Sequence, residues 1–168
     1  SHERCSVVEV MGHHAGYLAM YVGLACGATA VLVPEEPIDF ERDVIEKSRQ
    51  ARFDGFPHYM IVVAEGVASA PEISQRISDT ISLDPRVTVL GHIQRGGEPC
   101  PYDRVLSTRI GAGAAEAILD GEYGIMIGVI NGKIKRVPLA DCAGKLKMVS
   151  PKDQIVKAAK QIGISFGD

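Results

Sequence analysis

Short apolar runs alternate with longer stretches of helical periodicity along most of the chain. The runs are rich in Val and Ile and have the length of buried strands; they cover Cys5–Val10, Ala30–Val33, His58–Val63 and Val87–Leu90. Helices are expected over residues 17–26, 39–52, 71–81, 102–120 and 151–161. Strands that alternate with helices build βαβ units, so we expect an α/β fold, with a mainly parallel sheet in a Rossmann-like three-layer sandwich.

A different pattern follows the long helical stretch. The runs Ile125–Ile130 and Lys133–Val137 flank Asn131-Gly132, a dipeptide that favours the tight turn of a β-hairpin. We expect this hairpin to add an antiparallel edge to the sheet over Ile125–Val137. No internal repeat, low-complexity tract or linker precedes residue 138, so the sequence predicts a single α/β domain over residues 1–168.

Composition narrows the possible classes of function. The chain has 168 residues, 46% of them hydrophobic, and 18 Lys and Arg against 21 Asp and Glu give a net charge of −3. This hydrophobic content excludes intrinsic disorder, and the mild acidity argues against a nucleic-acid partner held by bulk electrostatics. Residues 15–34 carry no charge, but glycines interrupt them. A buried helix, a turn and a strand are therefore expected there, and no membrane partner.

The four cysteines are scattered through the sequence. They are Cys5, Cys26, Cys100 and Cys142, and none of them forms a CxxC pair. This spacing favours reduced thiols in a cytoplasmic protein over a disulfide scaffold or a zinc site. The sequence begins at Ser1 without a Met, which indicates an internal or processed start.

Candidate chemistry lies in the loops that follow the predicted strands, because ligands of open α/β sheets bind beyond the carboxyl ends of the strands. In Gly91–Gly97, glycines flank His92 and Arg95, and Arg86 opens the preceding strand. A guanidinium matches phosphate oxygens, and glycines let backbone N–H groups approach them, so this loop predicts an anion site. The alternative is a tight turn whose His and Arg are only surface side chains.

Two further loops have polar residues after a strand. Met11–Gly16 precedes a helix, whose N-terminus favours an oxyanion or sugar hydroxyls, and it matches neither GxGxxG nor a P-loop. His13 and His14 suggest a metal, but no third ligand has suitable spacing, and a plain glycine turn is the alternative. Glu65 could accept hydrogen bonds from sugar hydroxyls or cap a helix. Together the loops predict a site for a phosphorylated sugar or nucleotide.

Specific runs of residues resemble the second half of the 6-phosphofructokinase family. They are Val7–Gly12 (VVEVMG), the strand end at Glu65, Val89–Gly97 (VLGHIQRGG) and Pro101–Arg104 (PYDR). The resemblance covers nearly the whole chain in the same order. It implies phosphoryl transfer from Mg·ATP, or from pyrophosphate in some branches, to O1 of fructose 6-phosphate, giving fructose 1,6-bisphosphate. It also implies Mg²⁺ as a cofactor and a homo-oligomer, expected to be a tetramer.

The resemblance also implies a set of substrate-binding residues. They are Arg4, Met11, Gly12, His13, Glu65, Arg86, His92, Ile93, Gln94 and Arg95. Arg4 and Arg86 match arginines that reach the 6-phosphate from a neighbouring subunit. His13 stands where the family has an Arg that neutralises charge on the transferring phosphoryl group. Because a histidine does this only when protonated, its catalytic role is the weakest of these assignments.

Other family features are altered or lie outside these residues. At the bacterial effector site Thr29, Asp54 and Phe56 depart from the family pattern and only His58 is retained, so we expect weak or absent regulation there. The nucleotide loop, the catalytic aspartate and the metal-binding aspartate belong to the family's first half, so no metal ligand is assigned here. Residues 151–168 resemble the segment that packs toward that half. The alternative function is a non-catalytic, sugar-phosphate-binding regulatory module.

Overall fold

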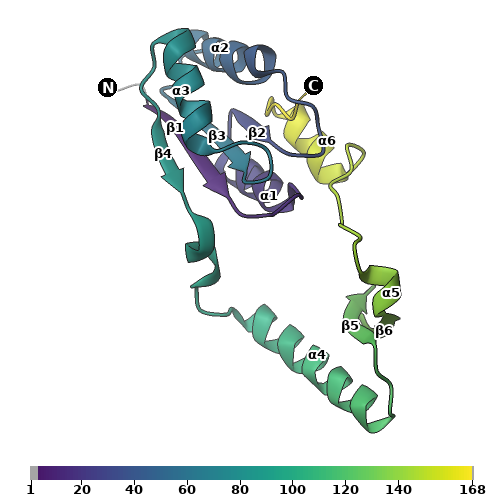
Figure 1. Cartoon of the computed structure of the whole chain (residues 1–168). Coiled ribbons are helices and arrows are strands. Elements are labelled where there is room, and N and C mark those ends of the chain that lie inside the picture. Colours follow the sequence, from purple (N-terminus) through teal and green to yellow (C-terminus); the bar gives the residue numbers. More distant parts are fainter. Residues whose placement is uncertain (1–3, 168) are drawn as a thin grey trace. The chain divides into compact units, whose positions relative to one another are not determined.

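The computed structural model describes residues 4–167. The chain divides into two compact units. Unit 1 comprises Ser1–Arg95 and Lys147–Asp168, and unit 2 comprises Gly96–Leu146. The chain therefore leaves unit 1 after Arg95 and returns to it at Lys147 (Figure 1).

Unit 1 is built on a four-stranded parallel sheet. The strands are β1 (Arg4–Val10), β2 (Ala30–Leu32), β3 (His58–Ala64) and β4 (Arg86–Val89), in the order β2-β3-β1-β4. All three pairings are parallel. The four predicted strands are confirmed, with ends that shift by one residue.

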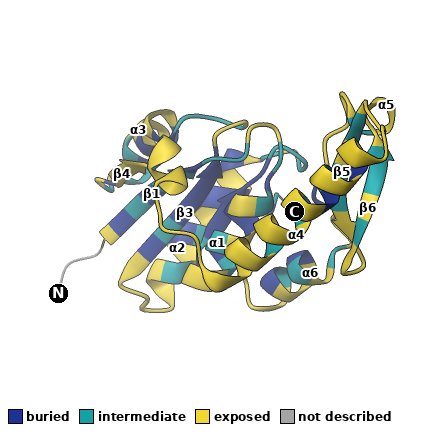
Figure 2. Ribbon diagram, turned by 90° about the horizontal axis from the view of Figure 1, so that it is seen from below, coloured by how far each residue is buried: buried dark blue, intermediate teal, exposed yellow. Residues whose placement is uncertain are grey.

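Helices cover both faces of this sheet. One face carries α1 (Tyr17–Cys26) and α6 (Gln154–Gln161), and the other carries the π-helix η1 (Glu41–Glu46), α2 (Lys47–Phe53) and α3 (Ala70–Ile81). Alternate strand residues point to opposite faces, so the sheet contributes to two separate clusters of buried side chains. Figure 2 shows the buried strands between these layers. The predicted α/β three-layer sandwich is confirmed.

The C-terminal helix belongs to one of these layers. Val156 and Ala159 of α6 are buried with Ala19 and Met20 of α1, and α6 begins three residues later than predicted. Asp153 accepts a hydrogen bond from the N–H of Ile155 at 3.0 Å, which caps the helix. That residues 151–168 also pack toward the family's first half stays a prediction.

Unit 2 contains α4 (Pro101–Leu119), β5 (Ile125–Ile130), β6 (Lys133–Pro138) and α5 (Leu139–Cys142). The hairpin turn has φ 51° at Asn131 and 75° at Gly132, the pair of positive values that a type I′ turn requires. Helix α4 lies against the hairpin at Gly113, where a Cβ would come within 2.9 Å of Ile134 and 3.3 Å of Ile127. The predicted hairpin is therefore confirmed.

The place of the hairpin in the fold differs from the prediction. Strands β5 and β6 pair with each other from Ile125↔Pro138 to Ile130↔Lys133, and they form a sheet of their own. The hairpin is thus a separate two-stranded sheet beside α4, not an edge of the parallel sheet. The chain forms two compact units, and a single α/β domain over residues 1–168 stays a prediction.

The uncharged stretch 15–34 forms α1, a turn and β2, as predicted. The turn is at Gly27, whose φ of 62° ends the helix in the left-handed conformation. Within residues 4–167 no helix combines the length and the apolar character needed to cross a membrane.

Candidate functional site

The loop that follows β1, residues 11–16, turns sharply before helix α1. The N–H of Ala15 donates to the carbonyl oxygen of Gly12 at 3.0 Å, and a Cβ on Gly12 would clash with the carbonyl of Ala15. His13 adopts a φ of 54°, in the left-handed region that residues other than Gly rarely occupy. The loop therefore forms a tight turn with a defined backbone conformation.

Glu65, directly after β3, holds the start of this loop. Its Oε1 accepts hydrogen bonds from the N–H groups of Gly12 at 3.1 Å and His13 at 2.7 Å. Gly66 allows the approach, because a Cβ there would clash with the carbonyl oxygen of His13. Within residues 4–167 no hydrogen bond is formed by Oε2 of Glu65, so this oxygen can accept from a ligand.

The pKa of Glu65 is lowered by these contacts. The largest cause is the hydrogen bond from the N–H of His13, followed by that from Gly12. The charges of the His13 and Arg95 side chains act in the same direction, and desolvation opposes them. Glu65 is therefore a carboxylate whose negative charge is stabilised by two backbone N–H groups and lies close to the side chains of His13 and Arg95.

The third segment of the site comes after β4. There the 3-10 helix η2 (Gly91–Arg95) begins at a glycine with a φ of 51°. Gln94 points its Oε1 at the N–H of Met11, which donates to it at 2.8 Å. Three consecutive N–H groups of the loop, those of residues 11–13, are thus bound by side chains from the ends of two other strands.

These three segments surround a cavity of about 260 Å³, here called the carboxyl-edge cavity. Its lining consists of Met11, Gly12, His13, Leu18, Glu65, Gln94 and Arg95. The structure therefore brings together six of the ten sequence-predicted site residues. His92 and Ile93 lie in the same turn but do not line the cavity, and the side chain of Ile93 is 73% exposed. Leu18 was missed, although its position in the first turn of α1 was a signal.

Arg4 and Arg86 lie elsewhere. Arg4 begins β1 and Arg86 begins β4, where it pairs with Ser6, so both are at the amino edge of the sheet. Along β1 this edge is about 20 Å from the cavity. The two arginines cannot join the cavity of their own chain, and their service to a neighbouring subunit stays a prediction.

The paired histidines do not form part of a metal cluster. The rings of His13 and His14 are 4.1 Å apart between centroids and tilted by 44°. Within residues 4–167 no three His, Cys, Asp or Glu side chains gather where they could hold a metal ion. The donor set that Mg²⁺ prefers is therefore not assembled by the described residues, and we derive no step through a metal.

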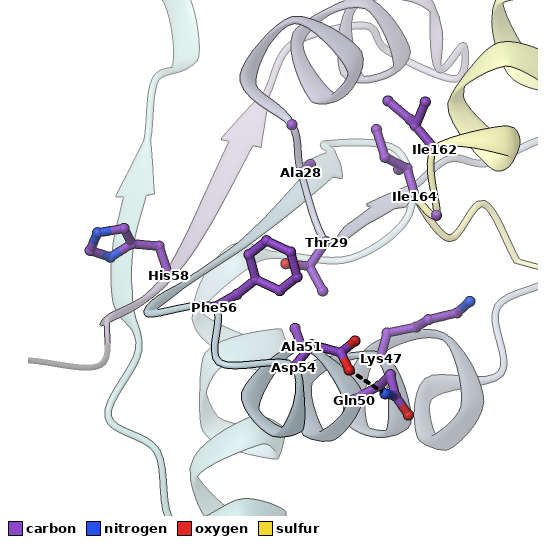
Figure 3. Close-up of a pocket in the computed structure, with 12 residues that line it drawn as sticks. Ala28, Thr29, Lys47, Gln50, Ala51, Asp54, Phe56, His58, Ile162 and Ile164 are labelled. Atoms are coloured by element: carbon purple, nitrogen blue, oxygen red, sulfur yellow. Dashed lines mark hydrogen bonds between the residues drawn. The ribbon is translucent and has the colours of Figure 1, made fainter.

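The residues that the resemblance aligns with the family's effector site lie around a second cavity, of about 410 Å³, at the amino edge of the sheet. Thr29, Asp54, Phe56 and His58 all line this amino-edge cavity, and Figure 3 shows them with Lys47 and Gln50 of α2. Its other lining residues are Gly27, Ala28, Ala51, Ile162, Gly163 and Ile164. The sequence thus identified residues that the fold does bring together.

The amino-edge cavity has a characteristic electrostatic setting. Its walls contain the segments that follow the C-terminal ends of α1, α2 and α6, and helix C-termini carry partial negative charge. Asp54 adds a carboxylate, whose Oδ1 accepts from Nε2 of Gln50 at 2.9 Å. Phe56 adds an aromatic side chain that is 61% exposed. Lys47 contributes the one lysine ammonium group of the lining.

Comparison with known proteins places the chain in a family. The family model described as phosphofructokinase matches residues 1–118. An ATP-dependent 6-phosphofructokinase 3 of Bacteroides thetaiotaomicron is 42% identical, over 99% of this chain and 51% of its own length. An ATP-dependent 6-phosphofructokinase of Bacillus mycoides is 51% identical, over 80% of this chain and 42% of its own length.

A solved structure extends the likeness to the fold. The pyrophosphate-dependent phosphofructokinase of Marinobacter aquaeolei superposes with a TM-score of 0.80, over 100% of this chain and 50% of that one, at 21% identity. The chain spans about half the length of the curated relatives it matches. Because the family model matches well over half of the sequence, the chain belongs to the phosphofructokinase family.

Proposed function

We propose that the chain supplies the fructose 6-phosphate site of a 6-phosphofructokinase. The observation that carries the proposal is the carboxyl-edge cavity, where the Glu65 carboxylate, the 11–13 backbone and Arg95 converge. The O1 hydroxyl of the sugar attacks the terminal phosphorus of the donor and gives its proton to a base outside this chain. The new P–O bond replaces the bond between that phosphorus and the bridging oxygen, which leaves with ADP, or with orthophosphate when pyrophosphate is the donor, and the sugar product is fructose 1,6-bisphosphate.

The chain's own residues act by binding and orienting the acceptor. Oε2 of Glu65 accepts from sugar hydroxyls, while Oε1 keeps the loop in place. The guanidinium of Arg95 pairs with the dianionic phosphate, for which its planar fork is suited. Leu18 gives the cavity an apolar wall. Holding the acceptor in one orientation lowers the entropic part of the barrier, and positioning and electrostatic stabilisation together account for most of the catalysis in this type of phosphoryl transfer.

His13 has a limited role in this proposal. Its side chain is exposed at the cavity and close enough to Glu65 to interact with its charge. An imidazolium could neutralise charge on the transferring phosphoryl group, but an imidazole carries that charge only under mildly acidic conditions. We therefore propose His13 as a sugar-loop residue first and a charge-neutralising residue second.

The remaining parts of the reaction are proposed to lie outside this chain's cavity. ATP or pyrophosphate, together with Mg²⁺, binds to the half of such a protein that this sequence does not contain. Arg4 and Arg86 reach the 6-phosphate of a neighbouring subunit in a homo-oligomer, proposed to be a tetramer. The four cysteines, all unpaired, support a cytoplasmic location.

The amino-edge cavity is proposed not to bind nucleotides or phosphoenolpyruvate. Three helix C-termini and Asp54 give it a negative setting that opposes anions. A single lysine, Lys47, is too little positive charge to offset them for a di- or triphosphate. Regulation by such effectors at this place is therefore weak or absent.

Calorimetry of the full chain tests the main proposal. Fructose 6-phosphate is titrated into the chain, with fructose as the phosphate-free control and circular dichroism as the check of folding. Saturable binding that requires the phosphate is the expected result. A folded chain that binds neither sugar, or both equally, would contradict the assignment of the acceptor site to this chain.

The alternative is a regulatory module that binds a sugar phosphate without turning it over. His13 in place of the family's arginine is the observation that favours it. A coupled assay of fructose 6-phosphate phosphorylation, with ATP or pyrophosphate as the donor, distinguishes the two functions in the protein that contains this chain. Phosphoryl transfer supports the kinase, whereas tight fructose 6-phosphate binding without turnover by either donor supports the module.

A further inference from the structure

Glu35, in the turn after β2, joins three segments that are far apart in the sequence. Its two carboxylate oxygens accept from the N–H of Gly16, at 2.9 Å and 3.1 Å. Its Oε1 also accepts from the N–H of Val149, at 2.9 Å. We propose that Glu35 is a positioning residue for the carboxyl-edge cavity: it fixes the end of the 11–16 loop and ties it to the chain's return into unit 1.

Helix α1 needs an acceptor at this point. An α-helix begins with four N–H groups that have no partner within the helix, and α1 has neither a side-chain cap nor an acidic residue in its first turn. Glu35 supplies the missing carboxylate from 19 residues away. Gly16 is buried, and a Cβ on it would lie 2.7 Å from Oε2 of Glu35 and 2.6 Å from Cβ of Val33. Glycine at this position therefore lets the carboxylate reach the backbone.

The loop is consequently anchored at both ends. Gln94 and Glu65 bind its first three N–H groups, and Glu35 binds its last. Between these anchors the loop has one internal backbone bond, from Ala15 to Gly12. If the Glu35 anchor is lost, the end of the loop and the first turn of α1, including the cavity residue Leu18, lose a fixed position.

The same anchor reaches the segment where the chain returns from unit 2. Val149 is buried, and the hydroxyl of Tyr17 donates to the carbonyl oxygen of Met148 at 3.1 Å. Nζ of Lys147 lies 5.0 Å from the centre of the Tyr17 ring. The departing segment ends at Arg95, next to Gln94, which also binds the loop. The segment by which the chain leaves unit 1 and the segment by which it returns are thus both held to residues 11–17, through Gln94 on one side and through Met148 and Val149 on the other.

Site-resolved amide hydrogen exchange tests this coupling in the full chain. Glu35→Ala removes both bonds, Glu35→Gln keeps the length but halves the acceptor oxygens, and Glu46→Ala removes an exposed glutamate of η1 as a control. We expect Glu35→Ala to speed exchange at Gly16 and Val149 and, by coupling, at Met11–His13. Glu35→Gln should give a smaller effect in the same places, and Glu46→Ala none.

A second readout depends on the proposed function, since it uses fructose 6-phosphate. Coupling energies of this type correspond to roughly twofold to thirtyfold in affinity, so we expect the Kd to rise about tenfold in Glu35→Ala and less in Glu35→Gln. Faster exchange confined to Gly16 and Val149, with an unchanged Kd, would show a merely structural contact and overturn the proposal.

The two readouts separate this inference from the proposed function. If the unsubstituted chain binds no fructose 6-phosphate, the proposed function fails, and the exchange at Met11–His13 still decides the coupling. If Glu35→Ala does not fold, Glu35→Gln decides it. The decisive case is a folded Glu35→Gln chain in which the Gly16 amide exchanges faster. If exchange at Met11–His13 is unchanged in that chain, the positioning role is contradicted.

Discussion

The two cavities of unit 1 lie at opposite edges of one parallel sheet, and opposite ends of helices line them. At the carboxyl edge, loop N–H groups and the first turn of α1 surround the space, with Arg95 among the lining residues. At the amino edge, the lining follows the C-terminal ends of α1, α2 and α6, with Asp54 at one of them. Helix N-termini carry partial positive charge and helix C-termini carry partial negative charge, so the helix ends give the two edges opposite signs before any side chain is counted.

The difference shows how a parallel topology divides its surface. Every βα connection brings a helix N-terminus to the carboxyl edge, and every αβ connection brings a helix C-terminus to the amino edge. Side chains can oppose or reinforce that division. In this chain Asp54 reinforces it at the amino edge and Arg95 reinforces it at the carboxyl edge, whereas Lys47 and Glu65 each oppose it at their own edge. Anion binding should therefore be confined to one of the two cavities.

Removal of Arg95 should have the largest effect on the difference in anion binding between the two cavities. We expect Arg95→Ala to weaken fructose 6-phosphate binding by about 2–4 kcal/mol, the scale for loss of a charge-assisted contact. Arg49→Ala is the control, because Arg49 is exposed and pairs with Glu41 at 2.8 Å, in the helical segment η1–α2. Calorimetry measures both. Equal affinity of the Arg95→Ala chain and the unsubstituted chain would remove Arg95 from the site.

The close approach at Gly66 gives the next largest effect. In Gly66→Ala the new Cβ meets the carbonyl oxygen of His13, so the loop must move away from Glu65. We expect unfolding in urea to show a loss of about 1–3 kcal/mol, the usual cost of overpacking, together with weaker sugar-phosphate binding. Gly111→Ala, in α4, is the control, because a Cβ there meets nothing within 4 Å. The same loss of stability in both variants would exclude a specific clash at Gly66.

The sequence predicted the strands that end at the carboxyl-edge cavity, but not that the hairpin forms a sheet of its own. These strands are continuous apolar runs, and the rule that ligands bind beyond strand ends then pointed to the loops containing His13, Glu65 and Arg95. Both signals are local, and neither depends on how distant segments meet. The same rule could not show that His92 and Ile93 of η2 do not line the cavity while Gln94 and Arg95 do.

Long-range contacts account for what could not be predicted. The carboxylate of Glu35 binds Gly16 and Val149, which lie 19 and 114 residues away, and no local pattern marks such a contact. The hairpin is similar: Asn131-Gly132 specifies its turn, but nothing near the turn says whether its strands join another sheet. The partners of a strand depend on burial against distant segments, which the residues next to the turn do not show.

A change of charge at the amino edge should produce a smaller but informative effect. The unsubstituted chain should show no measurable ADP binding at millimolar concentration, because three helix C-termini and Asp54 oppose it. Asp54→Lys reverses one charge in the lining and should improve ADP affinity at least about tenfold, or roughly 1.4 kcal/mol. Asp54→Asn is the matched control without a new cation. Clear ADP binding by the unsubstituted chain would contradict the electrostatic difference between the cavities.

The smallest expected effect is a lowered pKa of Glu65. Its measurement tests the carboxyl edge without a ligand. The N–H groups of His13 and Gly12 favour the carboxylate, so the pKa of Glu65 is lowered in the folded chain relative to the unfolded chain. A group whose pKa is lowered by folding stabilises the fold fully at a pH above its unfolded-state pKa, and this stabilisation disappears as the pH falls through its folded-state pKa.

The amide resonances of Gly12 and His13 should therefore shift together as the pH is lowered, and the midpoint of that shift should lie below the pKa of an ordinary glutamate. Glu65→Gln should abolish this common titration, because an amide has no proton to gain. A midpoint at or above the ordinary value would mean that the carboxylate does not hold the loop in solution.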